Sequence, residues 1–151
     1  MRKGAVFAAG LLFSTLSQAS PCEADLPKSY GHVQVDAVVG VYDGDTITVR
    51  IENWPAIVGE SIGVRVNGVD TPEIRGKCAS EKALAKKARA FTRTAVTEAG
   101  IVELRNLRRD KYFRLLADVC VDGQSLTEML VQSGLAYRYD GGKKQSWCGA
   151  S

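Results

Sequence analysis

The sequence has few of the residues that bind zinc, and it has no apolar run long enough to span a membrane. His32 is the single histidine among 151 residues, and none of the four cysteines forms a C-x-x-C pair. Zinc sites draw their ligands from clustered cysteines and histidines, so this composition argues against a zinc site. It also excludes a catalytic pair of histidines acting as acid and base. No apolar run reaches the ~20 residues that a membrane-spanning helix needs.

The longest apolar run lies at the N-terminus. Arg2 and Lys3 precede an uncharged segment, Ala5 to Leu16, and Ser17-Gln18-Ala19 then places small residues where a signal peptidase cleaves. This pattern predicts a signal peptide over residues 1–19. We therefore expect an exported protein, periplasmic or secreted, with no membrane attachment after cleavage.

The mature chain is expected to have almost no net charge. Cleavage after residue 19 removes two of the 20 basic residues and none of the 17 acidic ones, so the formal net charge falls from +3 to +1. Binding of a polyanion must then depend on where charges are placed. The remaining length suits one domain with a single core, and nothing in it indicates more than a monomer.

Four cysteines follow the predicted cleavage site: Cys22, Cys78, Cys120 and Cys148. An even number of cysteines in an oxidising compartment favours two disulfides. Three pairings are possible, and the spacing alone does not choose among them.

Apolar periodicity predicts one α+β domain over residues 33–151, after a loose leader at 20–32. The expected order is β-β-β-α-β-β-α, with strands at 33–39, 46–51, 62–70, 101–107 and 115–121. Asn67-Gly68 is a common turn pair, but the apolar alternation around it favours a strand that continues to Asp70.

Two helices complete this order. The longer helix is expected from Ser80, which caps its start, to Ala99. Its apolar stripe consists of Leu84, Ala88, Phe91 and Ala95. Its lysines and arginines lie off the stripe, and a solvated face is favoured over a nucleic-acid contact. A capping box, Ser125 to Glu128, opens a short helix that Gly134 ends.

Charged residues gather at the predicted strand ends, where a rigid scaffold presents function. They are Asp43, Asp45, Arg65, Asp70, Glu73 and the segment Asp110 to Arg114. Each alone has a plainer explanation, because Asp-Gly-Asp is more often a turn and a lone arginine more often a surface ion-pair partner. Together they suit phosphodiester hydrolysis, in which a hard cation and guanidinium groups meet the charge that develops on the phosphate.

Three motifs carry a more specific resemblance: Y-D-G-D-T (42–46), V-R-V-N-G-V-D-T-P-E (64–73) and R-D-K-Y-F-R (109–114). In this order they resemble the staphylococcal nuclease (thermonuclease) family, and the match runs from about Val33 to Tyr139. The resemblance implies a five-stranded OB-fold, a small β-barrel with helices packed on it.

The resemblance also implies a role for each matched residue. One Ca²⁺ ion would be bound by the carboxylates of Asp45 and Asp70 and the carbonyl of Thr71, with Asp43 in the outer shell. Glu73 would act as the general base, and Arg65 and Arg114 would hold the reacting phosphate.

Other matched residues would bind the rest of the substrate. Lys111 and Tyr112 would contact a neighbouring phosphate, and a tyrosine of the tail, either Tyr137 or Tyr139, would support the nucleotide. The implied function is an exported calcium-dependent endonuclease that cleaves DNA and RNA and leaves 3′-phosphate ends. The alternative is a catalytically inactive OB-fold module that binds nucleic acid or a protein partner. The catalytic activity is favoured, because the chain retains all five residues that the resemblance makes central to catalysis: Asp45, Arg65, Asp70, Glu73 and Arg114.

Three features depart from the family pattern. Phe113 replaces a glycine beside Arg114, the stretch 74–78 before the long helix is short, and the chain ends at Ser151 without a terminal helix. A Cys78–Cys148 disulfide would tie the short stretch to the tail, alongside Cys22–Cys120, and we expect this pairing. We interpret Trp54 as a hydrophobic plug in a loop rather than a base-stacking platform.

Overall fold

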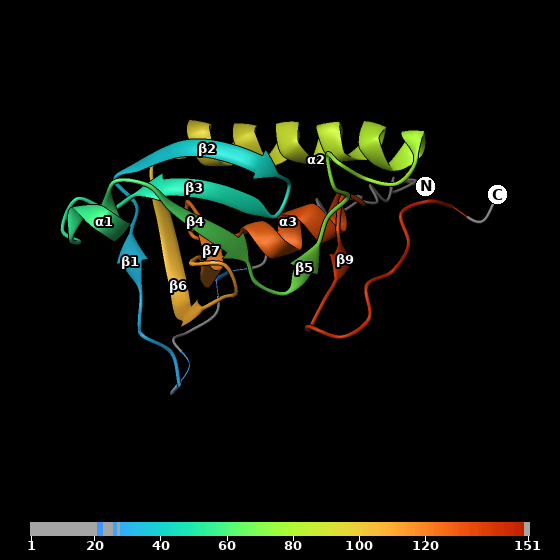
Figure 1. Ribbon diagram of the computed structural model, residues 1–151. Coiled ribbons are helices and arrows are strands. Elements are labelled where there is room, and N and C mark those ends of the chain that lie inside the picture. The colour runs from blue at the N-terminus through green and yellow to red at the C-terminus, as the bar shows by residue number, and fades with distance from the viewer. Residues whose placement is uncertain (1–20, 23–25, 27, 150–151) are drawn as a thin grey trace, which may run out of the picture.

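The computed structural model describes residues 21–22, 26 and 28–149 (Figure 1). The predicted signal peptide lies outside these residues. In the part of the chain that is described, no helix has the length and apolar character needed to cross a membrane.

A curled, mixed sheet forms the body of the fold (Figure 1). Its strands run in the order β1-β6-β7-β4-β3-β2, and β8 pairs with β7. Among the strand pairs of the described residues, only β4–β7 is parallel. The strands are β1 (Val33–Gln34), β2 (Ala37–Asp43), β3 (Thr46–Arg50), β4 (Ile62–Val66), β6 (Val102–Arg109), β7 (Leu115–Val121) and β8 (Gln124–Ser125). A second, two-stranded sheet pairs β5 (Val69–Asp70) with β9 (Tyr137–Arg138).

Three helices accompany the sheet in the described residues. Helix α2 (Ala79–Glu98) lies along β2, α3 (Leu126–Gln132) packs near β7, and α1 (Ala56–Gly59) is a single turn at one end (Figure 1). The core between them is formed by fully buried aliphatic side chains, among them Ile47, Val64, Leu104, Leu126 and Leu130. The α+β fold class predicted from the sequence is thus confirmed.

Two predicted strands are divided in the structure. The segment 33–39 divides at Asp36, whose carboxylate accepts a hydrogen bond from the N–H of Glu52. The segment 62–70 divides at Asn67-Gly68, where Gly68 has a φ of +81°. The predicted strand through this pair was therefore wrong, because β5 turns away to pair with β9. With these divisions and the short β8 and β9, the described residues contain nine strands, so the expected count of five holds only for the longest ones.

The long helix differs in its cap and its buried face. Its N-cap is Cys78, so the predicted cap Ser80 lies inside the helix. The most buried positions are Glu81, Ala85, Ala88, Thr92 and Val96, not the predicted stripe, although Ala88 belongs to both. Polar Glu81 and Thr92 are buried because they bind backbone groups of the site, a role that apolar periodicity does not reveal. The predicted cap of α3 is present: Ser125 accepts a hydrogen bond from the N–H of Glu128.

Two disulfides join distant parts of the chain. Cys22–Cys120 ties the leader to β7, and Cys78–Cys148 ties the start of α2 to the C-terminal tail. These are the pairs expected from the sequence.

Candidate functional site

The turn between β2 and β3 carries two of the predicted acidic residues and packs tightly on α2. Gly44 lies so close to Ala88 and Thr71 that an added Cβ would be 2.8 Å from the Ala88 side chain. The Thr92 hydroxyl donates a hydrogen bond of 2.6 Å to the Gly44 carbonyl. Glycine at this position therefore lets the helix fix the orientation of the turn, and with it the direction of Asp43 and Asp45.

Arg65 joins the two buried carboxylates of the site. The β3–β4 register places Arg65 opposite Thr46, next to Asp45. Its Nη1 lies 2.9 Å from Oδ1 of Asp45, and its Nη2 lies 3.5 Å from Oδ1 of Asp70. Nη2 also donates to the Val69 carbonyl at 3.0 Å. One guanidinium thus holds the ends of two separate strands together, as its planar fork allows.

Backbone groups orient the remaining acceptors. The N–H of Thr71 donates to Oδ2 of Asp45 at 2.9 Å, and the N–H of Ile74 donates to Oδ1 of Asp43 at 3.0 Å. Burial raises the pKa of Asp43 above its ordinary value, and the neighbouring carboxylates of Asp45 and Glu73 add to this effect, while the Ile74 hydrogen bond opposes it. The cluster therefore carries more negative charge than Arg65 alone balances.

The donor set suits a hard cation. Asp45, Asp70 and Thr71 are each at least 97% buried and offer only oxygen atoms. Oγ1 of Thr71 has no hydrogen bond in the described structure, which is unusual for a buried polar atom. Oδ1 of Asp70 lies near the cationic groups of Arg65 and Lys144. Oxygen ligands of this kind are those of calcium and magnesium rather than of zinc.

Glu73 lies at the rim of the site on a loop that α2 braces. Its side chain is 54% exposed. The buried carboxylate of Glu81 accepts hydrogen bonds from the N–H groups of Lys77 at 2.8 Å and of Glu73 at 3.4 Å. Gly76 leaves the space that Glu81 fills. The short stretch after Glu73 is therefore held by a side chain from the first turn of the following helix.

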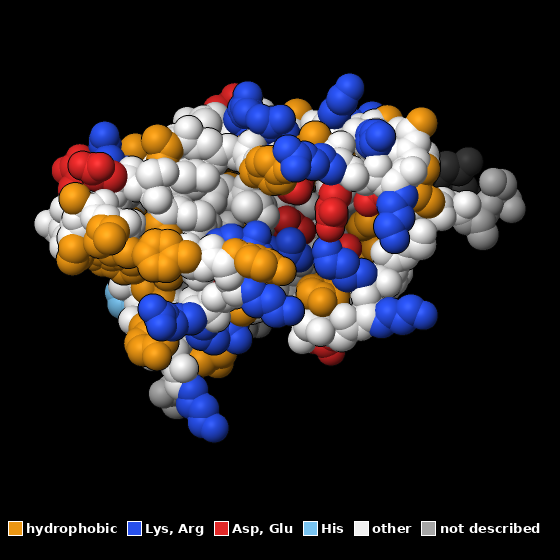
Figure 2. Space-filling model, in the orientation of Figure 1, with side chains coloured by type: hydrophobic (Ala, Val, Ile, Leu, Met, Phe, Trp, Pro, Cys, Tyr) orange, Lys and Arg blue, Asp and Glu red, His pale blue; other side chains and the backbone are white. Residues whose placement is uncertain are grey.

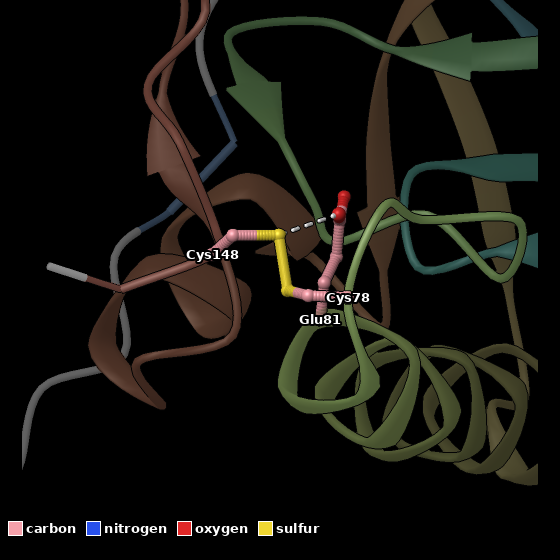
Figure 3. Close-up of side chains that lie close together, drawn as sticks. All are labelled: Cys78, Glu81 and Cys148. Carbon is pink, nitrogen blue, oxygen red and sulfur yellow. Dashed lines mark hydrogen bonds between the residues drawn. A yellow bond between two sulfur atoms is a disulfide. The ribbon is translucent and has the colours of Figure 1, made fainter. Parts of the chain in front are cut away.

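A disulfide covers this brace. Sγ of Cys148 lies 3.5 Å from Oε2 of Glu81, beside its bond to Cys78 (Figure 3). These three residues bring metal-type donor atoms together. The two sulfurs are bonded to each other and the carboxylate binds backbone N–H groups, so the cluster supports the loop and is not a metal site in this oxidised form.

The C-terminal tail contributes Lys144 and Trp147 to the site, two residues that the sequence reasoning missed. Nζ of Lys144 lies 2.7 Å from Oδ1 of Asp70 and 3.0 Å from Oε1 of Glu73. Burial alone lowers the pKa of Lys144, but its hydrogen bonds to Asp70 and Glu73 outweigh this and raise the pKa above its ordinary value. The indole N–H of Trp147 also donates to Oδ2 of Asp70 at 3.3 Å. The sequence signal for this contact was Cys148, which directly follows Trp147. Its disulfide with Cys78 holds this segment of the tail against α2.

Arg114 lines a pocket of about 650 Å³. Its Nε donates to Oδ2 of Asp110 at 2.6 Å, and its guanidinium carbon lies 5.8 Å from the centre of the Tyr112 ring. Gly63 on β4 leaves room for the arginine stem. Arg65, Glu73 and Arg114 thus line one pocket, together with Lys111, Tyr112, Tyr139 and Lys144.

The two tail tyrosines have different surroundings. Tyr139 lines the pocket, and its N–H donates to the Gly68 carbonyl at 3.0 Å. Tyr137 does not line the pocket; its ring stacks on Trp147 with 3.9 Å between centroids. The pairing of β5 with β9 causes this division, since it sets Tyr137 opposite Asp70.

Comparison with known proteins identifies the family of this chain. The family model described as "Staphylococcal nuclease homologue" matches residues 63–147, more than half of the chain. The chain belongs to the staphylococcal nuclease homologue family. The segment matched to this family includes Arg65, Asp70, Glu73 and Arg114, and also the tail residue Lys144.

Curated relatives in this family carry nuclease names. The chain is 32% identical over 109 residues to "Thermonuclease" of Staphylococcus hyicus, covering 72% of this chain and 61% of that protein. It is 40% identical over 97 residues to "Endonuclease YncB" of Bacillus subtilis (strain 168), covering 62% of this chain and 43% of that protein. It is 37% identical over 97 residues to "SPbeta prophage-derived endonuclease YokF" of the same organism, covering 62% of this chain and 30% of that protein. The matched part therefore spans between about a third and three fifths of each relative.

Proposed function

We propose that this protein is an exported, calcium-dependent nuclease that hydrolyses phosphodiester bonds of DNA and RNA. The observation that carries the proposal is the pair of buried carboxylates, Asp45 and Asp70, which Arg65 joins. Arg65 also lines the pocket that Arg114 lines. The printed names of the relatives, thermonuclease and endonuclease, support the same activity.

In this proposal the carboxylates of Asp45 and Asp70 and the carbonyl of Thr71 hold one Ca²⁺ ion, with Asp43 behind them. Their burial and oxygen-only chemistry support this assignment. The bound ion supplies positive charge next to the reacting phosphate and polarises its P–O bonds. Asp43 orients the turn through Ile74 and adds negative charge without needing direct contact.

The protein side chains then perform the proton transfer and the charge stabilisation. Glu73, exposed at the rim, accepts a proton from a water molecule as the water oxygen attacks phosphorus. The bond to the 5′-oxygen breaks, this oxygen receives a proton, and the 3′-phosphate remains on the other product. Arg65 and Arg114 donate hydrogen bonds to the equatorial oxygens, where the second negative charge develops. Because Nε of Arg114 is bound to Asp110, its Nη groups remain to meet the phosphate.

Residues around the pocket position the rest of the strand. Lys111 and Tyr112 lie on the turn beside Arg114 and suit a neighbouring phosphate, while Tyr139 suits the nucleotide. Tyr137 acts on the site indirectly: its ring stacks on Trp147, and the indole N–H of Trp147 donates a hydrogen bond to Asp70. The two disulfides support export to an oxidising compartment.

Cleavage of a labelled oligonucleotide by the mature, oxidised protein tests the proposal. We expect cleavage in Ca²⁺, none in chelator, and products that need a phosphatase before their 3′ ends can be extended. Glu73→Gln is expected to lose rate by orders of magnitude while it still binds Ca²⁺, and Glu98→Gln, at an exposed position on α2, serves as the matched control. If folded protein binds the oligonucleotide across pH 7–10 without cutting it, the inactive binding module is the correct interpretation.

A further inference from the structure

The turn between β6 and β7 presents two aromatic residues in an unfavourable backbone conformation. Tyr112 has a φ of +61° and Phe113 a φ of +54°. This left-handed region is disfavoured for bulky side chains, and residues held there cluster at functional sites. Tyr112 is 86% exposed and Phe113 is 68% exposed. Burial therefore does not compensate for the strained conformation, so the two rings have a use outside the folded core.

Tyr112 lines the catalytic pocket, whereas Phe113 lines a second hollow on the other side of Arg114. This hollow has a volume of about 340 Å³, and its apolar walls are Trp54, Val58, Ile62, Phe113 and Leu115. Asp110 and Arg114 line both spaces, so the two hollows adjoin.

A third hollow extends the second. It has a volume of about 330 Å³ and shares Trp54, Arg109 and Leu115 with the second hollow, and it adds Tyr30, Leu107 and Arg108. We call the second and third hollows together the aromatic groove. Figure 2 shows apolar side chains gathered beside lysines and arginines on this face of the molecule. The groove therefore begins at the proposed reacting phosphate and leads away from it.

The charges around the aromatic groove identify the kind of molecule that fits it. Its single acidic lining residue, Asp110, is paired with Arg114. Arg109 lines both of its hollows, and Arg108 lies between the groove and the catalytic pocket. Nη2 of Arg108 is buried without a hydrogen-bond partner in the described structure. Nε of Arg108 donates to the Asn106 carbonyl at 3.4 Å. Aromatic rings next to arginines that have no acidic partner among the described residues suit a chain that carries flat apolar bases on an anionic backbone.

We propose that the aromatic groove is an accessory subsite for unpaired nucleotides of the substrate strand. Bases two or more nucleotides beyond the phosphate at Arg114 stack on Phe113 and Trp54, and their phosphates contact Arg108 and Arg109. Here Trp54 acts as a platform, not only as the plug expected from the sequence. The proposal rests on the proposed nuclease function, and it predicts that a single strand longer than the catalytic pocket binds more tightly than a dinucleotide or a duplex.

Binding measured in chelator separates this subsite from cleavage. Fluorescence anisotropy of a labelled eight-nucleotide oligo-dT, with unlabelled dinucleotide and duplex as competitors, gives the affinities for full-length mature protein. Phe113→Gly removes the ring and keeps the turn, because glycine adopts a φ of +54° without strain. Ile101→Ala removes an apolar side chain of similar exposure elsewhere and is the matched control.

We expect Phe113→Gly to weaken binding of the eight-mer about tenfold, within the range for loss of one base–aromatic stack, and to leave dinucleotide binding unchanged. Unchanged eight-mer affinity would overturn the subsite. An equal loss for the dinucleotide would also overturn it, because the effect would then lie at Arg114.

Trp54 provides a second readout. The chain has two tryptophans, so in a Trp147→Phe background the emission comes from Trp54 alone. We expect the eight-mer, but not the dinucleotide, to quench it, and unquenched emission in the presence of bound eight-mer would contradict the stacking. If the subsite fails in these assays while wild-type protein still cleaves DNA in Ca²⁺, the proposed nuclease function stands without it. If neither binding nor cleavage occurs, both proposals fail.

Discussion

The ammonium group of Lys144 lies 2.7 Å from Oδ1 of Asp70, an oxygen that also lies 3.5 Å from Nη2 of Arg65. The same ammonium contacts Glu73 at 3.0 Å. A cation from the tail therefore partly neutralises the carboxylates to which we assign metal binding and proton transfer. A divalent ion that uses the same oxygen of Asp70 must compete with Lys144.

Removal of this lysine should therefore tighten calcium binding. For Lys144→Met we expect a two- to fivefold lower Kd for Ca²⁺, corresponding to roughly 0.4–1 kcal/mol, which lies within the range for a partly exposed ion pair. Isothermal titration calorimetry measures the change, and Lys143→Met, at the exposed neighbouring position, is the control. An unchanged or higher Kd would show that Lys144 does not compete with the ion.

The Cys78–Cys148 disulfide should hold the tail in the site. In a Cys78→Ser, Cys148→Ser double variant we expect Trp147 to leave Tyr137 and Asp70, since its anchor one residue away is lost. Tryptophan emission should shift to the red, and stability should fall by about 2–4 kcal/mol, the usual range for a disulfide.

The Cys22→Ser, Cys120→Ser variant is the control for this effect. It should lose comparable stability without the red shift, because this disulfide joins the leader to β7 and not to the tail. A red shift of the same size in both variants would mean that the tail does not depend on Cys148.

Glu81 should matter for both stability and rate. In Glu81→Gln the new amide group can accept through one atom only, so one of the two backbone N–H groups, of Glu73 or Lys77, loses its partner. We expect a loss of about 1–3 kcal/mol in urea denaturation, together with a lower kcat from a displaced Glu73. Wild-type kcat in a destabilised variant would show that the brace does not position the base. Glu98→Gln, at the far end of the same helix, should change neither quantity.

Replacement of Arg114 should affect the chemical step. Arg114→Lys keeps a positive charge but loses the planar fork, and we expect kcat to fall by roughly 10²–10³, the scale for loss of one preorganised donor. Arg93→Lys, at an exposed position on α2, is the matched control. Single-turnover rates check the result, and an unchanged kcat would remove Arg114 from the transition state.

The sequence alone determined those features of the fold that depend on interactions between residues close together in the chain. The strand Leu115–Val121 and the Ser125 cap of α3 follow from local alternation and local hydrogen bonding, and both occur as predicted. The acidic and basic motifs were visible because each lies in one short segment at a strand end. Their roles in catalysis stay predictions that the experiments above test.

Only the tertiary structure decided what depends on contacts between distant segments. Local alternation favoured one strand across Asn67-Gly68, but pairing with β9 separates β5 and sets Tyr137 opposite Asp70. Glu81 is buried because the loop before its helix folds back onto it. Lys144 reaches Asp70 across 74 positions of sequence because a disulfide and an aromatic stack fix the tail there. Periodicity describes which side of an element is apolar, whereas these contacts depend on which distant segments meet, and that is decided by the packing of the whole chain.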